Sequence, residues 1–198
     1  MNASPADEAY TKGADAFHRR EFDSAVGHFK KSVELNPDHF RAWAFMGMAN
    51  AAAGNIEAAI ENYRKCIDIN GSYHKAFNNI GELYRRKGQL DYAVMVFKMA
   101  TEMEGAEPHY FYNLGLAYGD VGMHQQSEGS LRKAHEMSPA EFDFASELSQ
   151  VQFTLNRLDD SIRTLNEFLA VAPGHERRSE AEAKLKMLER RKAEKKAI

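Results

Sequence analysis

The sequence predicts an all-α protein built from tandem pairs of antiparallel helices. Glycine recurs every 34 residues at Gly13, Gly47, Gly81 and Gly115, and a fixed period of this length is typical of solenoid repeats. Between these glycines, apolar residues recur at the three- and four-residue spacing of amphipathic helices. The chain also has 28 alanines against 18 β-branched residues, a balance that favours helix over sheet.

The period divides most of the chain into five units without insertion. We place them at residues 6–39, 40–73, 74–107, 108–141 and 142–175, which gives a repeat domain over residues 1–175 followed by residues 176–198. Two further columns have the same period, one small (Ala25, Ala59, Ala93, Ser127, Ser161) and one bulky (Phe29, Tyr63, Phe97, Leu131, Leu165). We expect the glycine and small-residue columns to face each other across each hairpin and the bulky residue to fill the space beside them. Gly81→Leu is then expected to be strongly destabilising and Gly81→Ala mild.

Each unit is expected to contain two helices separated by a tight turn. In the third unit, Phe77, Ile80 and Leu83 form one stripe, and Leu90 and Phe97 belong to the next. The turn column contains Gly54, Gly88, Gly122 and Asn156, all residue types that tolerate positive φ. Arg20, a residue type that disfavours positive φ, occupies this column in the first unit.

These residues resemble the tetratricopeptide repeat family. The second unit has Trp43, Met46, Gly47, Ala59 and Tyr63 in the family pattern; the third and fourth also match, and the outer two are looser. The resemblance implies a right-handed superhelical solenoid whose first helices line a concave groove that binds proteins.

A last amphipathic helix is expected from Glu176 to about Arg191, with Ala181, Leu185 and Leu188 on one face. This segment fits a capping helix and basic tail that cover the last hairpin. A basic docking segment for an acidic partner is the alternative.

Composition and motifs point away from several function classes. The net charge of −3 gives no nucleic-acid footprint, no apolar run is long enough to cross a bilayer, and no signal peptide is recognised, so we predict a cytoplasmic protein. Cys66 is the single cysteine and is expected to be a buried small residue. His124 and His135 are expected to be ordinary surface histidines, because no metal-binding spacing is present. We predict no enzyme activity, no metal and no cofactor.

The family resemblance also locates candidate groove residues. They are Tyr10, Phe45, Met48, Lys75, Asn78, Asn79, Arg85, Arg86, Tyr112 and Asn113. The second unit presents an uncharged row with Ala44, Phe45 and Met48, which is either an exposed anchor for a ligand or a surface covered by neighbouring side chains.

Polar candidates suggest how a peptide backbone would be held. Asn79 and Asn113 occupy the same repeat position, where an amide can bond to a peptide backbone; the alternative is that they are simply polar groove residues. Lys75, Arg85 and Arg86 make a positive patch. Only fragments match the family's clamp for the carboxyl terminus of chaperones.

The sequence therefore predicts a scaffold or adaptor that binds a peptide segment of a partner protein, extended or short and helical. A self-assembling structural protein and a regulatory subunit of a separate enzyme are the alternatives.

Overall fold

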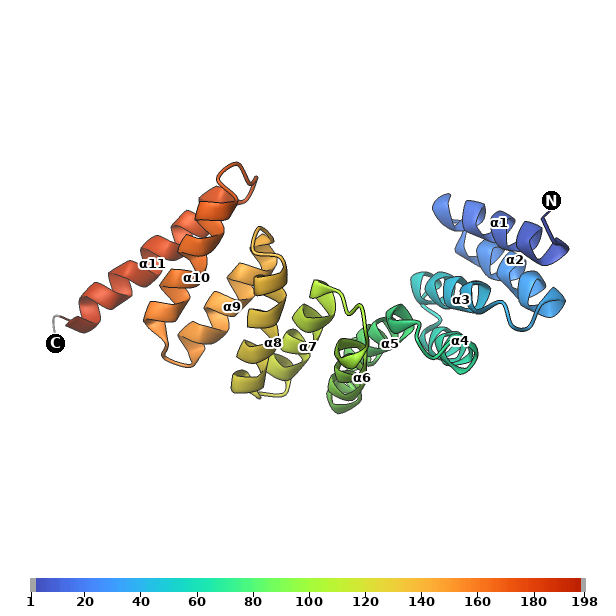
Figure 1. The fold of residues 1–198 in the computed structure, drawn as a ribbon, viewed down its shortest axis with the longest axis horizontal. Helices are drawn as coiled ribbons and strands as arrows, with labels where there is room; N and C mark the ends of the chain where they lie inside the picture. Colours follow the sequence, from blue (N-terminus) through green and yellow to red (C-terminus); the bar gives the residue numbers. More distant parts are fainter. Residues whose placement is uncertain (1–2, 197–198) are drawn as a thin grey trace. The chain divides into compact units, whose positions relative to one another are not determined.

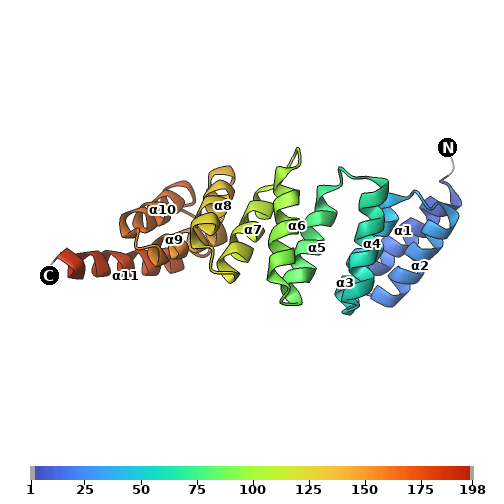
Figure 2. The ribbon, with the colours of Figure 1, turned by 90° about the horizontal axis from the view of Figure 1, so that it is seen from below.

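The computed structural model describes residues 3–196 and contains helices joined by short turns. Contacts between residues divide the chain into two compact units, the first ending at Met103 and the second beginning at Glu104. Within each unit, consecutive helices form antiparallel pairs (Figures 1 and 2).

Unit 1 contains three helix pairs. Their bounds are α1 Pro5–His18, α2 Phe22–Leu35, α3 Phe40–Ala53, α4 Ile56–Ile69, α5 His74–Arg86 and α6 Leu90–Glu102. The chain enters α1 through a capping box, in which the Ser4 hydroxyl accepts from the Asp7 backbone N–H and the Asp7 carboxylate accepts from that of Ser4.

Unit 2 contains two helix pairs and a longer final helix. Their bounds are α7 Pro108–Asp120, α8 His124–Met137, α9 Phe142–Thr154, α10 Leu158–Val171 and α11 Arg178–Lys196. Pro108 occupies the first turn of α7, where a missing N–H removes no helical hydrogen bond.

The glycine column lets the two helices of a pair approach closely. A methyl group placed on Gly81 would lie 2.7 Å from ring carbons of Phe97, and one on Gly47 would lie 2.9 Å from the ring of Tyr63. All five residues of the bulky column are buried. The sequence prediction that glycine makes room for the bulky residue is confirmed.

Hydroxyls strengthen the same crossing in unit 2. The Ser127 hydroxyl donates to the carbonyl of Gly115 over 2.7 Å, and the Ser161 hydroxyl donates to that of Ser149 over 2.8 Å. The small-residue column therefore faces the glycine column in these two pairs, as predicted.

The turn column has the backbone geometry that its residue types predict. Gly54, Gly88, Gly122 and Asn156 have φ values of 88°, 70°, 76° and 61°. Arg20 also adopts a positive φ of 63°, so the first turn has the same shape despite an unfavourable residue type.

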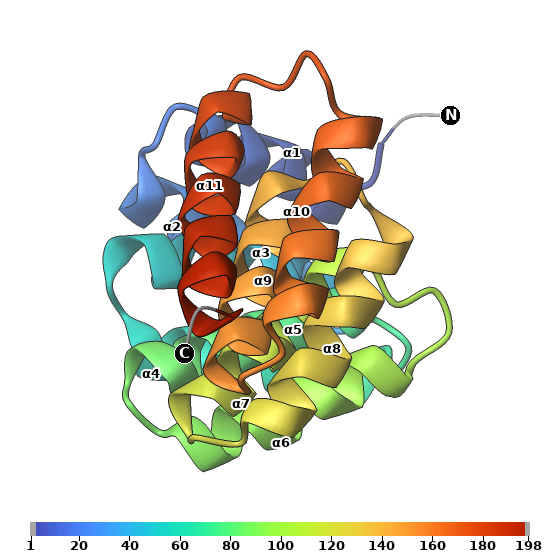
Figure 3. The same cartoon turned by 90° about the vertical axis from the view of Figure 1, so that its left-hand side faces the viewer.

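Helix α11 lies beside α10 (Figure 3). Ala181 is fully buried against Phe142 and Phe168, and Leu188 is also buried. The helix is longer than predicted: it begins at Arg178 rather than Glu176 and continues to Lys196, where the sequence predicted a tail after Arg191. Residues 197 and 198 lie outside the described range.

Candidate functional site

Helices α1, α3 and α5 of unit 1 surround a cleft of about 240 Å³, which we call the inner cleft. Its lining residues are Phe17, Met48, Ala51, Tyr63, Asn79, Glu82, Leu83 and Arg86. One wall is apolar, and the polar groups gather on α5 and at the Tyr63 hydroxyl. The first helices of three successive repeats therefore contribute to one cleft, which is the arrangement that the family resemblance implies.

The amide of Asn79 is held in place by a buried side chain. Its Nδ2 donates to the Tyr63 hydroxyl over 3.1 Å. Burial raises the pKa of the Tyr63 hydroxyl, so this group stays protonated across the physiological range. One N–H and the carbonyl oxygen of Asn79 remain for other partners, and a peptide backbone needs one donor and one acceptor.

Phe45 lies beside the cleft in an aromatic cluster. Its ring centroid is 5.5 Å from that of Tyr10, 5.8 Å from Phe29 and 6.4 Å from Phe17. Phe45 is half-buried, and Ala44 is fully buried. Of the two alternatives for this row, coverage by neighbouring side chains holds for Ala44, and neighbouring rings cover part of Phe45. Met48 is half-buried and lines the cleft.

The basic candidates of α5 differ in their surroundings. Arg86 is exposed, lines the inner cleft and forms no hydrogen bond or ion pair with any described residue. Lys75 and Arg85 interact with other groups of the protein and do not line the cleft. Asn78 is buried, so its side chain is not presented at the surface.

Two of the ten candidates belong to unit 2. Tyr112 is half-buried, with its ring centroid 4.9 Å from that of Phe144, and Asn113 is half-buried. Of the candidates in unit 1, the structure brings Met48, Asn79 and Arg86 into the inner cleft.

Five residues that line the inner cleft were not among the sequence-based candidates: Phe17, Ala51, Tyr63, Glu82 and Leu83. A signal for Tyr63 was present in the sequence. It is the only member of the bulky column with a hydroxyl, and a buried hydroxyl is expected to have a hydrogen-bond partner.

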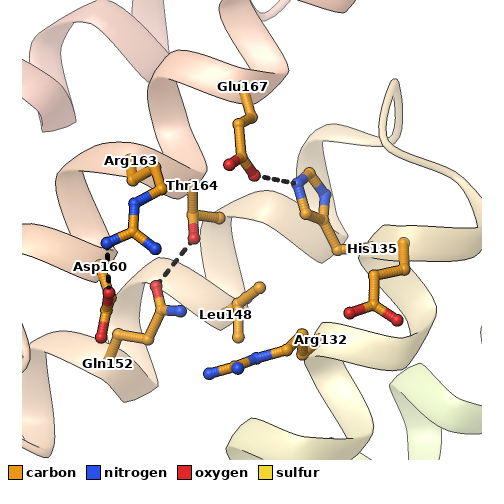
Figure 4. A pocket seen from close by; sticks show the side chains of 9 residues that line it. Arg132, His135, Leu148, Gln152, Asp160, Arg163, Thr164 and Glu167 are labelled. Carbon is orange, nitrogen blue, oxygen red and sulfur yellow. Dashed lines mark hydrogen bonds and ion pairs between the residues drawn. The ribbon is translucent and has the colours of Figure 1, made fainter.

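A second, polar pocket of about 220 Å³ lies between α8, α9 and α10 of unit 2 (Figure 4). Nε2 of His135 lies 3.7 Å from the Glu167 carboxylate, and Thr164 donates to Gln152 over 2.9 Å. His135 is only 5% exposed, its Nδ1 has no hydrogen-bond partner among the described residues, and burial lowers its pKa. The prediction that His135 is an ordinary surface histidine is therefore wrong.

No arrangement among the described residues points to catalysis. Cys66 is fully buried, and burial raises the pKa of its thiol to about 12, so the reactive thiolate is not populated at neutral pH. Within residues 3–196, no group of three or more His, Cys, Asp or Glu side chains is placed to hold a metal ion. No helix in the same range has the length and apolar character needed to cross a membrane.

Two models of the tetratricopeptide repeat match the chain, one over residues 10–74 and the other over residues 74–106 and 108–141. Together they cover more than half of its length. The chain belongs to the tetratricopeptide repeat family and has its all-α solenoid fold. This family is generally a non-enzymatic module for protein interaction, and its match supports a protein-interaction scaffold for this chain.

Solved structures share the fold at low sequence identity. The MamA protein is 17% identical with a TM-score of 0.74, over 83% of this chain and 90% of that chain. A thermophilic TPR protein of Thermus thermophilus, TTC0263, is 20% identical with a TM-score of 0.62, over 92% and 98%. YrrB, described as a TPR protein with an unusual peptide-binding site, is 14% identical with a TM-score of 0.68, over 88% and 90%. No curated protein matches the chain significantly in sequence.

Proposed function

We propose that the protein holds an extended peptide segment of a partner protein in the inner cleft of unit 1. The observation that carries this proposal is the hydrogen bond from Asn79 to Tyr63. It fixes an amide beside an apolar wall, with one donor and one acceptor left for a peptide backbone.

The two sides of the cleft supply different kinds of contact. Met48 and Phe17 provide an apolar surface for a side chain of the ligand. Arg86 has no partner among the described residues and lines the cleft together with the Glu82 carboxylate. The ligand that fits best is an extended segment with an apolar residue near an aspartate or glutamate that pairs with Arg86 and stays clear of Glu82.

Two further sequence predictions belong to this proposal. Asn113 of unit 2 is a second candidate for hydrogen bonds to a peptide backbone. A cytoplasmic location is also proposed, and it agrees with a buried Cys66 that has no disulfide partner. Self-assembly remains the rival function, and light scattering over a range of protein concentrations distinguishes the two.

A photo-crosslinking amino acid at position 48 tests the proposal. The captured peptide is identified, synthesised and titrated against the parent protein, Met48→Glu and Asn79→Ala. We expect each substitution to weaken binding by about tenfold or more, since about 1.4 kcal/mol corresponds to a factor of ten. Asn166→Ala, on the exposed surface of α10, is the matched control. Equal affinity for all four proteins would show that the inner cleft is not the site.

A further inference from the structure

Unit 1 has a second cleft that shares no lining residue with the inner cleft. It lies between α4 and α6, with α5 as its floor, and encloses about 270 Å³. We call it the outer cleft. Its apolar surface is formed mainly by Ile67, Phe77, Tyr84, Tyr92, Met95 and Met99.

The α6 side of the outer cleft is a stripe of exposed apolar side chains. Tyr92, Met95 and Met99 are 56%, 53% and 44% exposed. Their spacing of three and four residues places them on one face of the helix. Side chains of this size gathered at a cleft mark an interaction surface more often than scattered ones do.

The chain contains its own comparison for this surface. Two repeats further along, the residues equivalent to Tyr92, Met95 and Met99 are Asp160, Arg163 and Glu167. These line the equivalent pocket of unit 2 (Figure 4). The repeat fold therefore accepts charged residues at all three positions, and packing does not account for the apolar stripe of unit 1.

The charged groups beside the outer cleft favour a basic ligand. The outer cleft continues into a polar cleft lined by Glu57, Glu61, Lys87 and Gln89. Lys87 is paired with Glu57 over 2.8 Å, whereas Arg64 donates to the neutral Tyr84 hydroxyl over 2.8 Å and keeps its positive charge. Within residues 3–196, the Glu61 and Asp68 carboxylates form no hydrogen bond or ion pair. They lie two turns apart on α4, Asp68 at the outer cleft and Glu61 at its polar continuation, and these two carboxylates outnumber the single uncompensated cation of Arg64. Lys65, the other basic residue of α4, lines neither part of the cleft.

From this geometry we propose that the outer cleft docks an amphipathic helix of a partner protein, with an apolar face flanked by lysine or arginine. Helices α4 and α6 are 14 and 13 residues long, so a partner helix of about four turns matches their length. Methionine side chains adapt to different apolar surfaces, which suits a docking groove. A second copy of the chain offers a poor match, because the basic helix α11 has Ala181 and Leu188 buried within its own unit, which leaves Met187 as its one large apolar side chain that is more than half exposed among the described residues.

A pair of synthetic peptides tests the proposal. Each is a fluorescent helix of about 15 residues with leucine and methionine at positions i, i+3, i+4 and i+7. One has lysine on both flanks, and the other has glutamate at the same places. We expect the lysine peptide to bind at least about tenfold more tightly, with an advantage that falls as salt rises. Glu61→Gln with Asp68→Asn is expected to remove most of this advantage.

Substitutions taken from the equivalent positions of unit 2 identify the surface. Met95→Arg with Met99→Glu is expected to weaken binding of the lysine peptide at least about tenfold, with the helical signal unchanged. The matched control is Leu35→Arg with Val171→Glu, which changes two apolar residues that are 51% and 52% exposed outside the cleft. Asn79→Ala, which alters the inner cleft, should bind the lysine peptide like the parent protein.

Three results would overturn the proposal. The first is equal binding of the lysine and glutamate peptides. The second is unchanged binding by the Met95→Arg, Met99→Glu protein. The third is a concentration-dependent dimer that this double substitution abolishes, which would assign the cleft to a second copy.

Discussion

The side chains of Asn79 and Tyr63 join two successive repeats through a hydrogen bond of 3.1 Å. Asn79 belongs to the first helix of the third repeat, and Tyr63 to the second helix of the repeat before it. The Tyr63 ring packs against Gly47, where a methyl group would approach it to 2.9 Å. A residue of the inner cleft is thereby tied to the packing of the preceding hairpin.

The first prediction concerns this pair. Asn79→Ala and Tyr63→Phe should each lower the free energy of unfolding by about 0.5–1.5 kcal/mol, the net value of one hydrogen bond. Because both substitutions break the same bond, the double variant should lose less than the sum of the single losses. Phe29 and Phe97 occupy the column of Tyr63, so phenylalanine fits this position. Urea unfolding of the parent protein, the two single variants and the double variant measures the coupling free energy between the two side chains. Strictly additive losses would contradict the prediction.

The second prediction concerns Gly81. The sequence suggested that alanine is tolerated there, but a methyl group would lie 2.7 Å from the buried ring of Phe97. Gly81→Ala should therefore already cost about 1–3 kcal/mol, and leucine more. Gly27→Ala is the matched control, because nothing lies within 4 Å of the added methyl group and the position is within α2. The control should be stabilising by about 0.5–1 kcal/mol. Equal melting temperatures for Gly81→Ala and Gly27→Ala would contradict the role of close packing at Gly81.

The third prediction concerns the proposed capping role of α11. Leu188 is 3% exposed, whereas the neighbouring Met187 is 51% exposed. Leu188→Asp should cost several kcal/mol by burying a carboxylate among apolar groups, or should detach the helix. Met187→Asp should change stability by less than about 0.5 kcal/mol.

Hydrogen exchange distinguishes the two roles of α11. Leu188→Asp should speed exchange in α9 and α10 before the rest of the protein. If exchange and melting match those of Met187→Asp, α11 is not a cap, and the basic-docking interpretation of this segment gains support.

The repeat pattern predicted the fold because the period of 34 directly reflects a packing requirement. Gly13, Gly47, Gly81 and Gly115 recur because each faces a bulky side chain. The site was predicted less completely, because its details depend on contacts between repeats. Phe45 was identified, but its partial coverage by Tyr10 depends on how α1 and α3 pack. No one-dimensional pattern contains the Asn79–Tyr63 hydrogen bond.

The repeat position of His135 carries a sequence signal for its burial. This position is occupied by Val33, Ile67 and Leu169 in three other units and by Thr101 in the third. A mostly apolar column predicts burial, and a histidine within it is expected to be buried as well. The spacing of metal ligands concerns only whether His135 could bind a metal, and it carries no information on the burial of this residue.

The last prediction follows from that burial. Loss of hydration lowers the pKa of His135 below its ordinary value of 6.5, while the nearby Glu167 carboxylate opposes the shift. The folded protein therefore binds this proton less tightly than the unfolded chain does. Stability contributed by neutral His135 is present above about pH 6.5, and it declines as the pH falls from there toward the lower pKa of the folded state.

A single group such as His135 changes the free energy of unfolding by at most about 1.4 kcal/mol per pH unit. His135→Val, which introduces the residue of the first repeat at this position, should reduce the pH dependence of urea unfolding below pH 6.5. Glu136, Glu167, Asp160, Arg132 and Arg163 line the same pocket as His135, and the carboxylates of Glu167 and Glu136 are the charges that favour its protonated form. A Glu167→Gln variant should therefore lower the pKa of His135 further, measured by NMR titration of its ring protons. An unchanged pH dependence in His135→Val would mean that the folded and unfolded states bind this proton equally.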